Sequence, residues 1–438
     1  MTRSNLARSV ITLTVGNVFS ALLGVATGLV VVRQLGPENF GLVGVVIAIM
    51  SVAANLLDFR IYDLLSRMIY GLPIDTPHRV QTAIGIVRTG LMLQSVLSLV
   101  IGCAGVAAAL ILLHLFIDQT ATLTVLLAFA AAEAFSTLGG VLGFLQRFAR
   151  RALAMASVQV GIAAMRAAIV CFAVLHENSV EAYAKAVVIS SALSAMVNAL
   201  FLLSLALRHA SFAEIFRLEM SNISRFATEL RFVAFANLSG YGKLLHRSVD
   251  VLVVGYFCSD GETGVYKFAR SLTDTLYILY DAMYKAFQAD MLAWLTRNAG
   301  ESYRVFAKRL ALTAAGGTLV VLAAEYWMLP PVLELIVGDR YLPAIPTILW
   351  LSVPVFFIFG IQFWLWPILV FHGRLSAYSG LQIMSVVLVQ YGLPLVLFSI
   401  TGAASPWLFA LGYACSYVTV YVPLYLLERK AGPQFFPV

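Results

Sequence analysis

Residues 243–257 read KLLHRSVDVLVVGYF. The second half, VLVVGYF, is an apolar run typical of a membrane-spanning helix, whereas the first half carries Lys243, His246, Arg247 and Asp250. A charged side chain near the middle of a bilayer costs about 2.5–3.5 kcal/mol on the insertion scale, so such residues persist where they face water or a partner. The stretch therefore predicts a membrane helix with one side lining a hydrated interior.

The whole chain has the composition of a membrane protein. Its 438 residues are 61% hydrophobic and only 12% charged, and their mean hydropathy is +0.89, whereas soluble domains are about half apolar. One crossing of the bilayer takes roughly 20 apolar residues. We expect helices over residues 9–32, 40–59, 89–116, 121–145, 152–175, 183–207, 230–257, 264–292, 308–329, 346–371, 377–400 and 404–426. The sequence predicts an all-α polytopic membrane protein with about 12 transmembrane helices.

Basic residues predict the orientation of these helices. The loops on the side of the N-terminus hold 20 Lys and Arg residues, and the opposite loops hold 4. Because cytoplasmic loops carry the excess of positive charge, both termini are expected in the cytoplasm.

The chain divides into an N-terminal six-helix lobe (1–207), a linker (208–229) and a C-terminal six-helix lobe (230–438). Apolar residues of the linker recur at helical spacing: Phe212, Ile215, Phe216, Met220 and Ile223. This pattern predicts an amphipathic helix on the cytoplasmic surface, and the alternative is a plain polar linker.

The two halves carry a faint repeat. A shift of 223 residues lays LVV (29–31) on LVV (252–254), Gly41 on Gly264 and Asp58 on Asp281. Halves with the same topology are expected to be related by an axis along the membrane normal, with a central cavity between them.

Polar residues form stripes on the predicted helices 7 and 8. Lys243, Arg247 and Asp250 fall on one face of helix 7. The stripe of helix 8 consists of Arg270, Asp274, Tyr277, Asp281, Lys285 and Gln288. Two such helices predict a shared hydrated interior. Its cations suit an anionic substrate such as a pyrophosphate, and the candidate substrate-binding residues are Lys243, Arg247, Arg270 and Lys285.

Internal pairing is the alternative explanation for these charges. Helix-neighbour spacing allows the pairs Arg247 with Asp250, Arg270 with Asp274, and Asp281 with Lys285. Lys243 has no acidic residue one turn away in its own helix, so it is the cation best placed to bind a ligand.

The N-terminal half has fewer intramembrane charges. Glu133 lies in the middle of helix 4 and Arg166 in the middle of helix 5, where they form either a salt bridge or contacts to substrate or ion. Asp58 either completes the cavity wall or is a solvated carboxylate at the end of helix 2. His246 is either a titrating group or a hydrogen-bonded filler.

Motifs of common enzymes are absent from the sequence. It contains no GxxxxGK[ST], HExxH, CxxC or GxSxG pattern, and no predicted outer loop is long enough to hold a catalytic domain. We therefore expect no enzymatic activity, no cofactor, no metal site and no nucleic-acid partner.

Three stretches resemble one transporter family. They are VVVRQLGPENFGLVG (30–44), RSVDVLVVGYFCSDGETGVYKFA (247–269) and LELIVGDRYLPA (333–344). Their order and spacing are similar to those of the polysaccharide-biosynthesis flippase family, which holds the O-antigen and exopolysaccharide repeat-unit translocases. That family belongs to the multidrug/oligosaccharidyl-lipid/polysaccharide exporter superfamily. One departure is Asp58-Phe59-Arg60, where family members often have Gly at the third position.

The resemblance implies a function. A protein of this family moves a polyprenyl-pyrophosphate-linked oligosaccharide across the bacterial inner membrane by alternating access between two lobes. Expected partners are this lipid-linked oligosaccharide, membrane lipids, and a polysaccharide polymerase with its export proteins. Arg166 joins the candidate substrate-binding residues. The candidates for coupling to a proton or sodium ion are Asp250, Asp274, Asp281, Glu133 and Asp58.

Three other functions compete with flipping. A multidrug or small-molecule exporter of the same superfamily predicts an acidic or aromatic cavity for cations, and the surplus of cations on helices 7 and 8 argues against it. A membrane enzyme of polysaccharide assembly needs a catalytic outer loop. The third is a non-catalytic membrane partner of a polysaccharide assembly complex.

Overall fold

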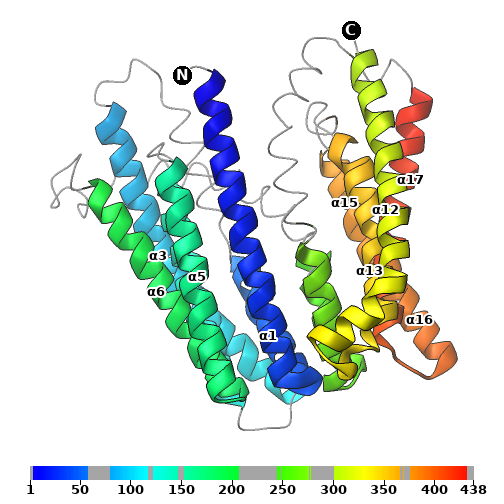
Figure 1. Ribbon diagram of the computed structural model, residues 1–438, viewed down its shortest axis with the longest axis horizontal. Helices are drawn as coiled ribbons and strands as arrows, with labels where there is room; N and C mark the ends of the chain where they lie inside the picture. Colours follow the sequence, from blue (N-terminus) through cyan, green and yellow to red (C-terminus); the bar gives the residue numbers. More distant parts are fainter. Residues whose placement is uncertain are drawn as a thin grey trace. The chain divides into compact units, whose positions relative to one another are not determined.

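The computed structural model describes residues 3–57, 79–116, 122–146, 152–206, 244–246, 248–275, 277, 300–365, 368 and 375–431. Within those ranges every regular element is a helix (Figure 1). Seven of the described helices are long and apolar enough to cross a membrane, and two shorter apolar helices accompany them. The described part of the chain is therefore built as a helical membrane protein.

The chain forms two compact units. The first consists of Met1–Thr27 and Val46–Leu244, and the second of Gly28–Val45 and Leu245–Val438. The second unit thus contains a piece of the N-terminal half. The predicted linker, residues 208–229, lies outside the described residues, so the boundaries expected from the sequence stay a prediction.

The first unit is a set of packed helices. Its described helices include α3 (Arg79–Phe116), α4 (Thr122–Gln146), α5 (Ala152–His176) and α6 (Val180–Ala206). α6 packs against α5 (Figure 1). It also packs against α4, which in turn packs against α3. Ser179 caps α6, because its hydroxyl oxygen accepts a hydrogen bond of 3.1 Å from the backbone N–H of Ala182.

α1 (Arg3–Leu57) contains two of the predicted membrane helices. Its 55 residues would measure about 80 Å as one straight helix, far more than the roughly 30 Å of a hydrocarbon core. The helix breaks at Gly36, whose φ of 73° is a left-handed value that glycine adopts without strain. Pro37 then starts the next helical segment, a position that suits its fixed φ.

The second unit centres on α17 (Pro406–Ala431). Its other elements are α10 (Val249–Phe257), a helix over 260–275, α12 (Gly300–Ile336), η2 (Asp339–Tyr341), α13 (Ala344–Phe357), η3 (Ile358–Gln362), α15 (Leu375–Ser385), η4 (Val386–Tyr391) and α16 (Gly392–Thr401). α17 packs against α13, η4, α15, α16 and α10.

Two of these elements, η3 and η4, are π-helical segments inside membrane spans. Such segments often occur at functional sites. η3 follows Pro354, which lacks the N–H that would close a helical turn. Next to η4, α17 approaches closely at Gly412, where an added Cβ atom would lie 2.5 Å from the carbonyl oxygen of Gln390.

A capping box starts the helix over 260–275. The Ser259 backbone N–H and hydroxyl donate to Oε2 of Glu262 at 3.0 and 2.9 Å, and the Glu262 N–H donates back to Oγ of Ser259 at 3.4 Å. The sequence SDGE (259–262) is the Ser-x-x-Glu pattern of this motif. It fixes the turn between α10 and the following helix.

Within the second unit, the segment after Gly36 crosses the helix over 260–275 at backbone contact. A Cβ atom added to Gly41 would lie 1.9 Å from the carbonyl oxygen of Asp260, and one added to Gly264 would lie 1.9 Å from that of Pro37. Both contacts obey the shift of 223 residues, since Pro37 corresponds to Asp260 and Gly41 to Gly264. This reciprocity is the signature of a two-fold relation.

Two further contacts of the crossing join residues to their own counterparts under the same shift. A Cβ atom added to Gly261 would lie 3.7 Å from Cγ of Glu38, and one added to Gly44 would lie 2.9 Å from Cγ of Lys267. Residue 38 corresponds to 261 and residue 44 to 267. The faint sequence repeat therefore has a structural counterpart at this crossing.

Candidate functional site

Five of the predicted site residues lie outside the described residues: Lys243, Arg247, Lys285, Asp281 and Asp58. The other five are described. Asp250, Asp274 and Arg270 meet in one polar cluster of the second unit, whereas Glu133 and Arg166 belong to the first unit.

Asp250 anchors the polar cluster from the first turn of α10. Its Oδ1 accepts a hydrogen bond of 2.8 Å from the backbone N–H of Val251, and its Oδ2 accepts one of 2.9 Å from the Tyr266 hydroxyl. The same Oδ2 lies 3.6 Å from Nε of Arg270. Both oxygens of this buried carboxylate are thus occupied by protein groups.

Arg270 is the cation of the cluster and is fully buried. Its Nε also lies 3.7 Å from Oδ1 of Asp274, one of the internal pairs that the sequence spacing allows. Its Nη2 donates to the carbonyl oxygen of His246 at 3.3 Å, and the guanidinium carbon lies 4.1 Å from the centre of the Tyr413 ring. Two carboxylates and an aromatic face compensate the buried charge, so the geometry supports a structural role for Arg270.

His246 connects the cluster to η4. Its Nδ1 lies 2.5 Å from Oε1 of Gln390, whose Nε2 donates to the carbonyl oxygen of His246 at 3.4 Å. This arrangement assigns the ring proton to Nδ1, because Oε1 only accepts. The ring stacks on Tyr413 and Tyr417, with centroids 4.4 and 4.7 Å away. The interpretation of His246 as a hydrogen-bonded interior residue is confirmed.

A column of tyrosines on α17 extends the cluster. The Tyr277 hydroxyl lies 2.5 Å from that of Tyr413 and 3.0 Å from that of Tyr417. Tyr421 stacks on Tyr417 with centroids 5.6 Å apart. Tyrosines recur every four residues from 413 to 425 in YACSYVTVYVPLY, a spacing that places them on one helix face. The sequence contained this signal, and our sequence interpretation missed it.

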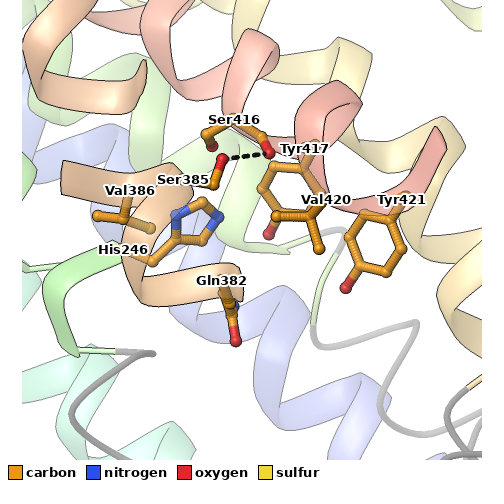
Figure 2. A pocket seen from close by; sticks show the side chains of 8 residues that line it. All are labelled: His246, Gln382, Ser385, Val386, Ser416, Tyr417, Val420 and Tyr421. Atoms are coloured by element: carbon orange, nitrogen blue, oxygen red, sulfur yellow. Dashed lines mark hydrogen bonds between the residues drawn. The ribbon is translucent and has the colours of Figure 1, made fainter. Parts of the chain in front are cut away.

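A small cavity lies beside His246 (Figure 2). Its volume of about 10 Å³ is room for a single water molecule. It is lined by His246, Gln382, Ser385, Val386, Ser416, Tyr417, Val420 and Tyr421. The Ser385 hydroxyl donates to the carbonyl oxygen of Ser416 at 2.9 Å, drawn as the dashed line in Figure 2. The cavity is far too small for a sugar or a pyrophosphate.

A larger hollow of about 610 Å³ lies between α3 and α4 in the first unit. Its lining is mostly small and apolar: Ser95, Ser98, Leu99, Gly102, Cys103, Val106, Leu127, Ala130, Ala131, Ala134 and Phe135. Because none of these residues is charged, this hollow does not suit an anionic group.

Glu133 and Arg166 are neighbours in the first unit. Arg166 interacts electrostatically with Glu133 on α4 and with Tyr183 on α6. Arg166 is exposed on α5 and Glu133 is partly buried. The Tyr183 ring packs against Phe129 with centroids 5.9 Å apart. An exposed cation beside a carboxylate leaves both the structural pair and the ligand contact open.

One intramembrane carboxylate was not considered in the sequence analysis. Glu325 lies in the membrane span of α12, and its Oε1 accepts a hydrogen bond of 3.1 Å from Ser352 of α13. It is the one acidic residue in the apolar stretch between Arg309 and Glu334. Within the part of the chain that the structure describes, no group of three or more His, Cys, Asp or Glu residues gathers as a metal site.

The family model described as polysaccharide biosynthesis protein matches residues 6–286, more than half of the chain. This chain belongs to the polysaccharide biosynthesis protein family. The predicted family is confirmed. No individually curated protein matches this family member significantly.

Three transporters of known structure are similar to this family member. The MATE multidrug transporter DinF-BH, solved with a bound ligand, matches with a TM-score of 0.66 and 16% identity, over 100% of this chain and 97% of that chain. An inward-facing multidrug resistance MATE family transporter of the MOP superfamily matches with a TM-score of 0.65 and 16% identity, over 93% and 94%. A Vibrio cholerae MATE transporter, VcmN, matches with a TM-score of 0.55 and 12% identity, over 99% of both chains.

At these identities the likeness shows the fold. The predicted fold class, an all-helical polytopic membrane protein of about 12 transmembrane helices in two lobes, is confirmed. This polysaccharide biosynthesis family protein is thus a multi-pass membrane protein with the fold of these transporters.

Proposed function

We propose that this protein flips a polyprenyl-pyrophosphate-linked oligosaccharide across the bacterial inner membrane, with both termini in the cytoplasm. The observation that carries the proposal is the match to the polysaccharide biosynthesis family in a chain with a transporter fold. A multi-pass chain of this type serves biosynthesis by moving an intermediate rather than by making a bond.

The head group of this substrate requires cations inside the membrane. Arg270 already faces two carboxylates, so its charge is used within the protein. We assign the pyrophosphate to Lys243 and Arg247, which flank His246 in the sequence, with Lys285 and Arg166 as further contacts. Arg binds phosphate oxygens in bidentate fashion and Lys adds a point charge.

Ion coupling falls on carboxylates that retain access to solvent. Asp250 is buried, with both oxygens occupied. The side chain of Asp274 is 40% exposed, and Glu133 is partly buried beside Arg166. Among the described carboxylates of the sequence prediction, we therefore rank Asp274 and Glu133 before Asp250. Asp281 and Asp58 stay predictions.

The proposal includes partners. The substrate is a lipid-linked oligosaccharide whose apolar tail stays among membrane lipids, and a polysaccharide polymerase and export proteins act on the flipped product. Nucleic acid is not among the expected partners, because the positive charge of the chain follows the membrane-topology rule.

The test uses Lys243→Ala, Arg247→Ala and the double variant, each at normal membrane abundance. Arg309→Ala is the matched control, since Arg309 is an exposed cation at the start of α12. We expect the three test variants to lower surface polysaccharide and to accumulate lipid-linked precursor facing the cytoplasm. A normal amount of surface polysaccharide in all three variants would contradict the assignment of the pyrophosphate to Lys243 and Arg247. Loss of polymer without precursor accumulation points to a defect in synthesis and contradicts flipping.

A further inference from the structure

Glu325 is an acidic residue inside the candidate membrane span of α12. The span runs from Lys308 to Ile336, so Glu325 lies about 16 Å from Ile336 and about 26 Å from Lys308 along the helix axis. Ionisable residues within a membrane span are costly, and they are functional candidates by default.

The carboxyl group of Glu325 lies against α13. Its neighbours Tyr326 and Trp327 are 63% and 77% exposed, which shows that α12 lies on the surface of its unit. Oε1 of Glu325 accepts from the buried Ser352 hydroxyl, whereas Oε2 is buried and has no hydrogen-bond partner among the described residues. One side of the carboxyl group therefore lacks the donors that an ionised group requires.

This environment favours the neutral acid. An ionised carboxylate offers about four acceptor sites, and the described residues supply a single donor, Ser352. Among the described elements, those packed against α12 are α13, η3 and η2. No residue of α13 or η3 titrates, and η2 holds Asp339, Arg340 and Tyr341 at the end of the span. A carboxyl group that has a buried oxygen and no cation among the described residues beside it binds a proton instead.

The partner helix contains an irregular joint next to this contact. Ser352 lies two residues before Pro354, and the π-helix η3 follows Phe357 directly. The N–H of Ile358 is shared between the carbonyl oxygens of Pro354 and Val355. Proline and π segments are the usual places where a membrane helix bends. The contact between Ser352 and Glu325 thus lies next to a place where α13 can bend.

We propose that Glu325 is a proton-binding site of the transport cycle. Its carboxyl group holds a proton while α12 packs against Ser352. The O–H bond breaks and the proton passes to water when α13 bends and water reaches Oε2. This role rests on the proposed flippase function, and it adds a coupling residue to those expected from the sequence. Too few oxygens surround the carboxyl group, among the described residues, for a metal ion.

Proton binding is measured first, without substrate. The full-length protein is reconstituted in liposomes, and infrared difference spectra are recorded between about pH 5 and about pH 9, a range that spans the usual carboxyl values. We expect a protonated-carboxyl C=O band that is missing from Glu325→Gln. The matched control is Glu334→Gln, an exposed acid on the same helix, and it keeps the band. Ser352→Ala moves the loss of the band to higher pH, because the hydroxyl stabilises the ionised form.

Transport is measured second, with precursor extracted from cells that lack the protein. We expect an imposed proton gradient to accelerate flipping by wild type and by Glu334→Gln. Glu325→Gln loses this acceleration but keeps exchange without a gradient, because the amide still accepts from Ser352. A purely structural role predicts that Glu325→Gln responds to the gradient as wild type does.

Three results overturn the proposal: a C=O band unchanged in Glu325→Gln, a wild-type gradient response in that variant, or acceleration by a sodium gradient in place of a proton gradient. Failure of the wild-type protein to move the precursor at all refutes the proposed function instead. In that case the infrared comparison alone decides whether Glu325 binds the proton.

Discussion

Adding a single methyl group at Gly264 is expected to disrupt the helix crossing in the second unit. The Cβ atom of Gly264→Ala would lie 1.9 Å from the carbonyl oxygen of Pro37, whereas real Cβ atoms stay at least 3.0 Å from other atoms. The two segments must therefore separate by about 1.1 Å or more. Both clashing groups belong to helical backbone, so rotation of a side chain cannot relieve the contact.

Overpacking of an interior costs about 1–3 kcal/mol. We expect about 2–3 kcal/mol for Gly264→Ala, because the backbone must move. A loss of 2 kcal/mol changes the ratio of folded to unfolded protein about 30-fold. Gly41→Ala should cost a similar amount, since its Cβ atom meets the carbonyl oxygen of Asp260 at the same 1.9 Å.

The assay is thermal unfolding of the purified protein in detergent, followed by intrinsic fluorescence. Gly316→Ala in α12 is the control, because nothing lies within 4 Å of its added Cβ atom. Its midpoint should stay equal or rise slightly, as helix propensity favours alanine. One separation relieves both clashes, so the double variant Gly41→Ala with Gly264→Ala should cost less than the sum of the single variants. The reasoning is refuted if Gly264→Ala unfolds at the midpoint of Gly316→Ala.

Three further predictions concern the second unit. Arg270→Met leaves Asp250 buried without its cation, so we expect the free energy of unfolding to fall by about 3–5 kcal/mol in the same unfolding assay. Adding Asp250→Asn should restore part of this stability. An unfolding midpoint unchanged in Arg270→Met would contradict the ion pair. Burial, with a smaller contribution from the Glu262 charge, raises the pKa of the Cys258 thiol to about 12. Iodoacetamide should therefore react slowly with Cys258 at about pH 8 and faster as the pH approaches that pKa, and Glu262→Gln should shift the rise in reaction rate to lower pH. Alkylation at about pH 8 as fast as that of free cysteine would argue against this environment. Tyr277→Phe removes the hydroxyl group that contacts Tyr413 and Tyr417 of the tyrosine column and should cost about 0.5–1.5 kcal/mol, whereas a cost near zero would mean that the short hydroxyl contact adds no stability.

The fold class could be predicted from the sequence because the bilayer fixes the length of its helices. The apolar stretches 121–145 and 152–175 became α4 and α5 within one residue at each end. The predicted helix 308–329 became the longer α12, since the helix continues through the residues 300–307 before the apolar run and through the residues 330–336 after Leu329. Hydropathy locates a membrane span but not the helical turns that extend outside it.

The polar cluster could be predicted only in part. Spacing along one helix identified the pair of Arg270 with Asp274, which the structure contains. It did not identify the contact of Arg270 with Asp250, because these residues come from different helices. The partnership of His246 with Gln390 joins residues 144 positions apart, and no pattern within one helix encodes such a contact. Glu325 was different, since its isolation in an apolar run was visible from the start.

The reciprocal crossing constrains how the two halves of this chain diverge. If a duplicated gene supplied both halves, each position on the crossing once faced its own copy. Two lysines or two glutamates would then have met as like charges, whereas two glycines fit. Today glycine faces glycine at 41 and 264, and glycine faces a long side chain at the pairs 38–261 and 44–267. A larger residue has thus entered on one side at a time, so in related sequences we expect these positions to change as pairs.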